Sequence, residues 1–165
     1  MQHGYNSDST VRVGTKALTS GDFDVSVTGK VSNVGSGNNW RWGIDFRLKT
    51  DETLDEYYGF RIWSEKQWSF YYLQDGYTRR AIAVDRPVLN MNAEGANTLR
   101  VIALGDQFTF FINGQKLAQL TDTSLPSDGD YRLELFSREI TEKDVATQMK
   151  VTLTAFSALL VAAAP

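Results

Sequence analysis

The sequence contains no cysteine and a single histidine among its 165 residues. The absence of cysteine excludes disulfides, thiol nucleophiles, cysteine zinc sites and iron–sulfur clusters. The one histidine, His3, stands near the start of the chain. A Ser-His-Asp triad or a histidine-rich metal site is therefore not expected.

The chain also lacks a strong excess of charge and a long hydrophobic run. It has 17 Lys and Arg residues and 20 Asp and Glu residues, for a formal net charge of −3. This balance does not favour binding to nucleic acid through bulk charge. The apolar tail, residues 156–164, is far shorter than the ~20 residues of a membrane helix. We therefore expect no nucleic acid partner and no membrane span, and residues 1–4 show no signal peptide.

The apolar content is that of a folded domain. Hydrophobic residues make up 42% of the chain and aromatic residues 12%. These proportions are typical of globular rather than disordered proteins, and the length suits one domain. We expect an N-terminal tail over residues 1–10, one domain over 11–156, and a C-terminal tail or the start of a linker over 157–165.

Apolar residues recur at every second position, which is the spacing of half-buried β-strands. In residues 40–49 this places Trp40, Trp42, Ile44, Phe46 and Leu48 on one face and Arg41, Gly43, Asp45, Arg47 and Lys49 on the other. Similar alternation predicts strands over residues 11–18, 23–27, 57–63, 68–73, 81–84, 99–103, 108–112, 131–136 and 149–156. Residues 138–146 are the one segment that fits a helical turn, and we expect a charged loop there instead.

Turn-forming residues separate these runs. Asn113-Gly114, between residues 108–112 and 115–117, is typical of a two-residue hairpin, because a type I′ turn needs positive φ at both central positions. Glycine, asparagine and aspartate also gather at residues 20–22, 35–39, 75–76, 104–106 and 127–130. Many short strands with regular turns predict an all-β, two-sheet antiparallel jelly-roll sandwich.

Several segments also resemble a known family. They are Gly21 to Val25, Gly43 to Arg47 followed by Tyr57 to Phe60, Asn97 to Asp106 leading into Phe108 to Gly114, and the last strand, residues 149–156. In this order they resemble concanavalin A-like, laminin G-like jelly-roll domains of bacterial type, over residues 11–156. The resemblance implies that the last strand returns beside the first. This architecture carries lectins, glycosidases and adhesion modules, so it implies a fold more than one activity.

In such a fold one sheet curves and leaves a concave outer face, where aromatic rings can stack on sugars and polar groups can bind hydroxyls. Alternation places Arg41, Asp45 and Arg47 together on one strand, and Tyr57, Arg61 and Trp63 on the next. Guanidinium groups suit bidentate contacts to hydroxyls or a carboxylate. The alternative is that these charges form cross-strand ion pairs on a solvated sheet, which contribute little.

The tryptophans divide by the same alternation. Trp63 is out of phase with the apolar Phe60 and Ile62, so we expect it to face outward, as does Tyr71. Trp42 and Trp68 are in phase with apolar neighbours and are expected in the core. Trp40, next to the loop 35–39, fits either the core edge or a ligand-binding rim.

Catalytic and metal sites are harder to find. Laminarinase-type hydrolases of this fold resemble one another in a Glu-x-Asp-x-Glu strand, and neither residues 52–56 nor 142–144 match that spacing. Hydrolases of this fold without that motif remain open. Asp128 and Asp130, and also Asp22 and Asp24, offer the oxygen ligands that calcium prefers, although Ser-Asp-Gly-Asp is equally a common turn.

These observations predict a non-catalytic carbohydrate-binding or adhesion module that recognises a glycan or polysaccharide. The expected ligand-binding residues are Trp63, Tyr57, Arg61, Arg41, Asp45, Arg47, Tyr71 and Trp40, and calcium is the cofactor to test at Asp128 and Asp130. The resemblance implies an extracellular or cell-surface location within a larger protein. The alternatives are a glycoside hydrolase of the same fold and a structural domain that mediates protein assembly.

Overall fold

The computed structural model describes residues 9–15, 22–32, 39–50, 55–64, 67–85, 95–125, 129–138 and 150–160. These residues form two antiparallel sheets, and no helix occurs among them. The six-stranded sheet has the order β1 (Ser9–Thr15), β10 (Asp130–Arg138), β3 (Asn39–Thr50), β4 (Asp55–Trp63), β5 (Gln67–Gln74) and β6 (Tyr77–Asp85). The five-stranded sheet has the order β11 (Lys150–Leu160), β2 (Phe23–Ser32), β7 (Ala96–Leu104), β8 (Gln107–Ile112) and β9 (Gln115–Thr121).

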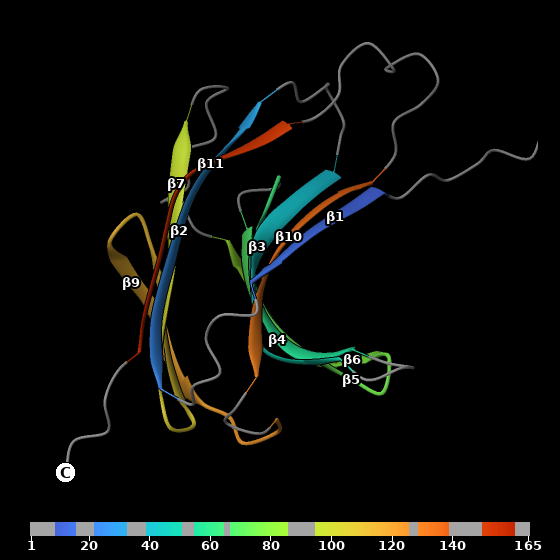
Figure 1. Cartoon of the computed structure of the whole chain (residues 1–165), viewed down its shortest axis with the longest axis vertical. Coiled ribbons are helices and arrows are strands. Elements are labelled where there is room, and N and C mark those ends of the chain that lie inside the picture. Colours follow the sequence, from blue (N-terminus) through green and yellow to red (C-terminus); the bar gives the residue numbers. More distant parts are fainter. Residues whose placement is uncertain are drawn as a thin grey trace, which may run out of the picture.

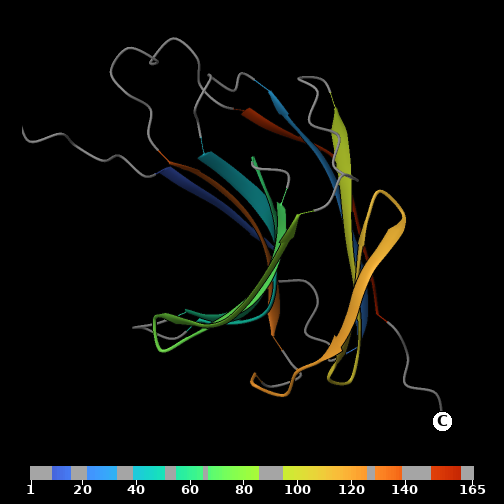
Figure 2. The ribbon, with the colours of Figure 1, turned by 180° about the vertical axis from the view of Figure 1, so that it is seen from behind.

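The sheets stack as two layers, and the six-stranded sheet bends so that its concave side faces away from the five-stranded sheet (Figures 1 and 2). The closing strand β11 pairs with β2, the first strand of its sheet, as the family resemblance implied. β1 begins two residues before the predicted domain start, and β11 continues four residues past the predicted end. The predicted all-β jelly-roll sandwich is confirmed.

Alternation along the central strands builds the core. In β7, the residues at every second position are buried and their neighbours are partly or fully exposed. Aromatic rings from both sheets meet in the middle: Phe110 of β8 lies 4.9 Å from Phe60 and 5.1 Å from Phe70, between ring centroids. Trp42 and Trp68 are buried in this cluster, as predicted. Trp40, for which core and rim were both open, is also part of it.

The predicted outward position of Arg47 is wrong. A register shift between Phe46 and Lys49 marks a β-bulge, and Arg47 adopts a positive φ of 51° there. The bulge breaks the alternation that places Asp45 outward, so the Arg47 side chain turns toward the other sheet and is buried. Leu48, predicted to be in the core, is only partly buried.

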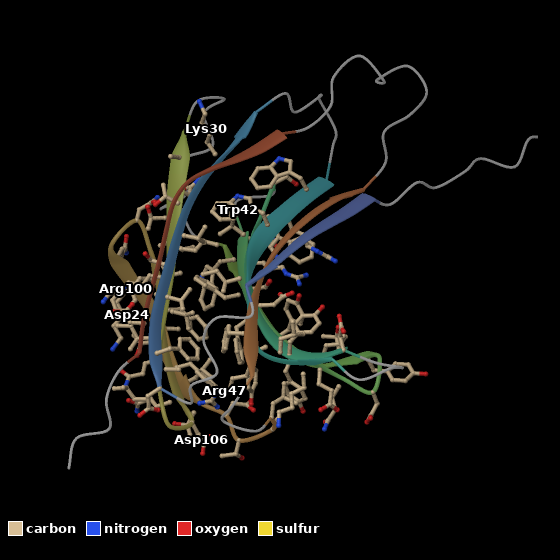
Figure 3. All side chains as sticks on the ribbon, in the orientation of Figure 1. Asp24, Lys30, Trp42, Arg47, Arg100 and Asp106 are labelled. Carbon is tan, nitrogen blue, oxygen red and sulfur yellow. The ribbon has the colours of Figure 1, made fainter. Side chains whose placement is uncertain are left out.

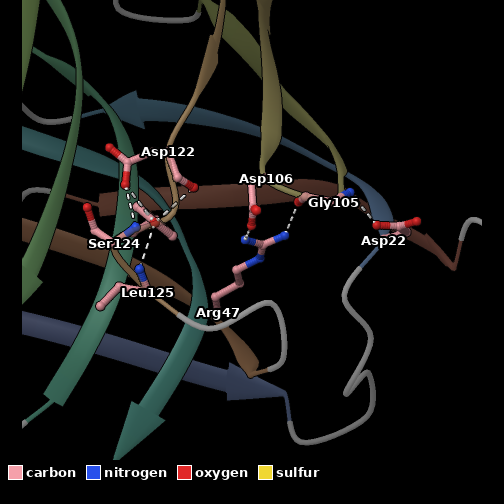
Figure 4. Close-up of polar contacts among 8 residues, drawn as sticks. Asp22, Arg47, Gly105, Asp106, Asp122, Ser124 and Leu125 are labelled. Carbon is pink, nitrogen blue, oxygen red and sulfur yellow. Dashed lines mark hydrogen bonds and ion pairs between the residues drawn. The ribbon is translucent and has the colours of Figure 1, made fainter.

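Arg47 links the two sheets at one end of the sandwich (Figures 3 and 4). Its Nη2 donates a hydrogen bond to the carbonyl of Gly105 in the β7–β8 turn, and its Nη1 lies 3.5 Å from Asp106 Oδ1. The guanidinium carbon also lies 4.8 Å from the centre of the Phe108 ring. Asp22 holds the same turn by accepting a hydrogen bond from Gly105 N. Arg47 therefore closes one end of the core and does not lie on the outer face with Asp45.

A second link joins the sheets through Tyr58. Its hydroxyl donates to Asp122 Oδ1 at 2.9 Å and accepts from Leu125 N at 2.9 Å. Asp122 Oδ1 also accepts from Ser124 N, which fixes the segment after β9 (Figure 4). Burial raises the pKa of Tyr58 well above its ordinary value, and the Asp122 carboxylate raises it further.

Removing the Arg47 side chain is expected to destabilise the fold. Arg47→Ala loses the hydrogen bond to Gly105 and the contact with Phe108, which we expect to lower the free energy of unfolding by about 2–3 kcal/mol. Arg47→Gly should lose about 1 kcal/mol less, because glycine tolerates the positive φ. Urea denaturation measures both variants against Lys49→Ala, a change at an exposed neighbour. A loss no larger than that of Lys49→Ala would show that Arg47 does not link the sheets.

Tyr58 is expected to make stability depend on alkaline pH. Above pH about 10 the unfolded chain loses the phenolic proton, whereas the folded chain keeps it because its pKa is raised. The free energy of unfolding should therefore fall by ~1.4 kcal/mol per pH unit from this group above pH about 10. Tyr58→Phe should be less stable at neutral pH but show a shallower fall, as measured by denaturation at several pH values. Parallel curves for both proteins would contradict this assignment.

Candidate functional site

Seven polar and aromatic side chains gather on the outer, concave face of the six-stranded sheet. They alternate along their strands with core residues such as Trp42, Ile44 and Phe60. We call them the concave-face cluster: Arg41, Asp45, Tyr57, Arg61, Trp63, Ser69 and Tyr71. They come from β3, β4 and β5, which are neighbours in the sheet.

A buried ion pair lies at the centre of the cluster. Arg61 Nη2 donates to Asp45 Oδ1 at 2.8 Å, and the two side chains are 2% and 0% exposed. Gly43 lies opposite Arg61 in the register, and a Cβ at Gly43 would come within 2.8 Å of Arg61 Cγ. Glycine at this position therefore leaves room for the Arg61 side chain to lie across β3.

Two tyrosines enclose the same guanidinium. The Arg61 guanidinium carbon lies 4.8 Å from the centre of the Tyr71 ring and 5.9 Å from that of Tyr57. The two rings pack edge to face with centroids 6.1 Å apart. A Cβ at Gly59 would lie 2.5 Å from Tyr71 Cζ, so the missing side chain lets the Tyr71 ring lie over β4. Arg61 is thus held by one carboxylate and two rings.

Trp63 forms the more accessible end of the cluster. Its indole Nε1 donates to Ser69 Oγ at 2.8 Å, which fixes the orientation of the ring. The Arg41 guanidinium carbon lies 5.0 Å from the Trp63 ring centre, within the range of a cation–π contact. Arg41 and Trp63 are half-buried, whereas Asp45, Tyr57, Arg61, Ser69 and Tyr71 are buried.

The structure brings together six of the eight predicted ligand-binding residues: Arg41, Asp45, Tyr57, Arg61, Trp63 and Tyr71. Arg47 and Trp40 are separated from them, because Arg47 links the sheets and Trp40 packs in the core. Sequence reasoning missed Ser69 and the role of Gly59. Ser69 is in phase with Tyr71 on β5, so the alternation contained a signal for it. The need for glycine at position 59 depends on the register with Tyr71 and is visible only in the structure.

The cluster holds one carboxylate, Asp45. On the neighbouring strand β10, Arg132 lies opposite Asp45 in the register and Glu134 lies opposite Gly43. A glycosidase needs two carboxyl groups about 5–10 Å apart. Among the side chains described, Asp45 is the one acid of the cluster, and the side chain of Glu134 lies outside them.

The predicted calcium ligands remain a prediction. Asp128 and the side chain of Asp130 lie outside the described residues. Asp22 accepts a hydrogen bond from Gly105 N, and Asp24 pairs with Arg100. The described part of the chain contains no group of three or more His, Cys, Asp or Glu residues that would hold a metal ion.

The outer face of the five-stranded sheet carries a similar set of residues in a different setting. Arg100 Nε donates to Asp24 Oδ1 at 2.7 Å, and Arg100 Nη2 donates to Asp24 Oδ2 (Figure 3). The Arg100 guanidinium carbon lies 5.4 Å from the Phe111 ring centre. The hydrogen bond to Asp24 raises the pKa of Arg100. Here the Arg100 side chain is 44% exposed. These three partly exposed residues, Arg100, Asp24 and Phe111, offer a matched control for the concave-face cluster.

Comparison with known proteins identifies the fold. No family model and no curated protein matches the sequence. The carbohydrate-binding module CBM66 from Bacillus subtilis superposes with a TM-score of 0.70 and 16% identity, over 92% of this chain and 83% of that one. Sheep galectin-11, in complex with glycerol, superposes with a TM-score of 0.62 and 14% identity, over 96% of this chain and all of that one. A Bacteroides ovatus GH16 protein from a mixed-linkage glucan locus superposes with a TM-score of 0.63 and 10% identity. The match covers 90% of this chain and 74% of that one.

These neighbours are all concanavalin A-like jelly rolls, and the chain has this fold. At such low identity the likeness carries the fold and no activity. In the described part of the chain, no helix is long and apolar enough to cross a membrane.

The central ion pair is expected to stabilise the concave face. Asp45→Ala leaves the buried Arg61 without this carboxylate, so the free energy of unfolding should fall by about 3–5 kcal/mol. Asp45→Ala combined with Arg61→Met should cost less than Asp45→Ala alone, because it leaves no buried charge that has lost the Asp45 carboxylate. Asp24→Ala breaks the exposed pair on the other sheet and should cost about 1 kcal/mol or less. Urea denaturation of the three variants tests this order, and equal losses for Asp45→Ala and Asp24→Ala would contradict it.

Proposed function

We propose that the protein is a non-catalytic carbohydrate-binding module and that its concave-face cluster contacts a glycan. The observation that carries this proposal is a set of aromatic and arginine side chains on the outer face of a sheet, where they are not needed for the core. Aromatic rings offer flat apolar surfaces to the CH faces of sugars, and arginine donates to hydroxyl oxygens. Lectin-type and carbohydrate-binding neighbours of the same fold support it.

The ligand that suits this surface is a chain of sugars. The polar groups at the centre already bind one another through Asp45 and Arg61, so they have less capacity for new partners. Less buried side chains lie toward the two ends of the cluster. Trp63 and Arg41 lie at one end, and Leu73, which lies opposite Tyr57 in the register, is at the other. Trp63 and Tyr57 lie six residues apart on β4, which is about 20 Å along a strand. A ligand that contacts both ends must therefore span several sugar rings.

A second candidate is hydrolysis of a glycoside. The observation that favours it is the register, which places Glu134 of β10 opposite Gly43, two residues from Asp45 on β3. Release of reducing sugar from a polysaccharide panel, lost in both Asp45→Asn and Glu134→Gln, would replace the binding module with an enzyme. If the protein binds a polysaccharide of the panel and releases no reducing sugar from any of them, the non-catalytic proposal is supported.

We also propose that the module acts outside the cytoplasm as one part of a larger protein. This rests on the resemblance to lectin and adhesion domains.

A third candidate, a domain for protein assembly, predicts a stable oligomer. Light scattering measures the mass of the protein in solution with and without the glycan ligand. A stable oligomer would support the assembly function, and a monomer would support a lectin.

Glycan binding is expected to depend on Trp63. A glycan array identifies the ligand class, and isothermal titration then measures affinity for oligosaccharides of increasing length. Trp63→Ala should weaken binding at least about fivefold, because truncating an aromatic side chain that carries binding costs more than about 1 kcal/mol. Phe111→Ala, which removes the aromatic partner of Arg100 on the opposite face, should leave affinity unchanged.

Absence of binding to any glycan at millimolar concentration would refute the proposed function. Equal affinity for a single sugar and for a long chain would refute only the chain-like ligand. Equal losses in Trp63→Ala and Phe111→Ala would show that the effect does not come from the concave face.

A further inference from the structure

The β8–β9 hairpin contains the only Asn-Gly sequence in the chain, at Asn113 and Gly114. Both residues have positive φ, 51° and 79°, as the predicted type I′ turn requires. Both are exposed, and a Cβ added to Gly114 would meet no atom within 4 Å. The peptide bond after Asn113 is therefore uncrowded and in contact with solvent.

The Asn113 side chain extends the pairing of β7 with β8 by one residue. Asn113 N donates to the Thr98 carbonyl at 2.8 Å, as a strand residue would. Thr98 N in turn donates to Asn113 Oδ1 at 2.8 Å, so the carboxamide oxygen takes the place of a backbone carbonyl. Asn113 Nδ2 donates to Oδ1 of the buried Asn97 at 3.0 Å. Both ends of the carboxamide are thus held against β7.

We propose that Asn113 is a site of spontaneous deamidation that the folded hairpin suppresses. In this reaction the deprotonated backbone nitrogen of Gly114 attacks Asn113 Cγ, a C–N bond forms, and the carboxamide nitrogen leaves as ammonia. Water then opens the resulting succinimide at either carbonyl and gives aspartate or isoaspartate. Glycine after asparagine favours the attack because it has no side chain to hinder it. The attack requires the carboxamide to leave Thr98 and Asn97, so the reaction rate follows local opening of the hairpin.

The products cannot restore the original contacts. Aspartate at position 113 can still accept from Thr98 N, but it loses the Nδ2 donor and places a carboxylate oxygen against Asn97 Oδ1. Isoaspartate adds a methylene to the backbone at a position whose dihedral angles define the turn. Either product weakens the end of the β7–β8 pairing. A chain that has been deamidated at Asn113 is therefore expected to open at this hairpin more easily than the original chain. This inference is independent of the proposed sugar binding.

The test compares the folded and the denatured wild-type chain at pH 8. Peptide mapping by mass spectrometry, with enzymatic detection of isoaspartate, measures the rate at Asn113. We expect the rate in concentrated urea to exceed the native rate by more than about tenfold. Asn97, which precedes the bulky Thr98, should stay unmodified in both conditions and serves as the internal control. Equal rates at Asn113 in the two states would overturn the proposal, as would an unmodified Asn113 in urea.

A variant tests the hydrogen bond that restrains the carboxamide. Asn97→Ala removes the acceptor of Asn113 Nδ2 and should speed native deamidation about fivefold, the effect expected for one hydrogen bond. Thr109→Ala, a change on the outer face of β8 away from the turn, should not change the rate. An unchanged rate in a folded Asn97→Ala protein would show that this bond does not protect the site. If Asn97→Ala does not fold, the comparison on the wild-type chain decides.

Discussion

The packing of aromatic rings between the two sheets determines what every other part of the chain can do. Phe108 and Phe110 of β8 contact Phe46, Tyr58, Phe60 and Phe70 of the facing sheet, with ring centroids 4.9–6.1 Å apart. Burial of such large apolar surfaces is the main source of stability in a domain of this size, and it fixes the phase of each strand. Once Phe60 and Ile62 face inward, Arg61 and Trp63 must face outward. The concave-face cluster is thus a consequence of the core.

An outward position does not by itself make a side chain accessible. Asp45 and Arg61 lie on the outer face, yet they are as buried as core residues. Burying charges is costly, and here the cost is offset by the ion pair and by the two tyrosine rings around the guanidinium. The ion pair is therefore the buried part of the concave-face cluster, and Trp63 and Arg41 are its more accessible side chains. This division separates residues whose loss is expected to affect folding from residues whose loss is expected to affect the proposed binding.

The strands, turns and fold class were predictable because each depends on local spacing. The Asn113-Gly114 hairpin follows from its turn residues. The outward positions of four side chains follow from alternation alone: Tyr57, Arg61, Trp63 and Tyr71. Arg47 was not predictable in this way, because a bulge inserts a residue and reverses the phase, and no signal in residues 40–49 marks it. The burial of Asp45 also escaped prediction, since it depends on the register that brings Gly43 opposite Arg61 and Gly59 opposite Tyr71.

The two sheets carry the same chemistry on their outer faces with different results, and curvature explains why. Each has an arginine that binds an aspartate and covers an aromatic ring: Arg61 with Asp45 and Tyr71, and Arg100 with Asp24 and Phe111. On the six-stranded sheet the outer face is concave (Figure 1), so side chains from β3, β4 and β5 converge and exclude water from one another. On the other sheet the Arg100 side chain stays 44% exposed. Composition alone therefore does not mark a binding surface. The bend of the sheet concentrates aromatic and guanidinium groups on one face, and this concentration is the reason for placing the proposed ligand there.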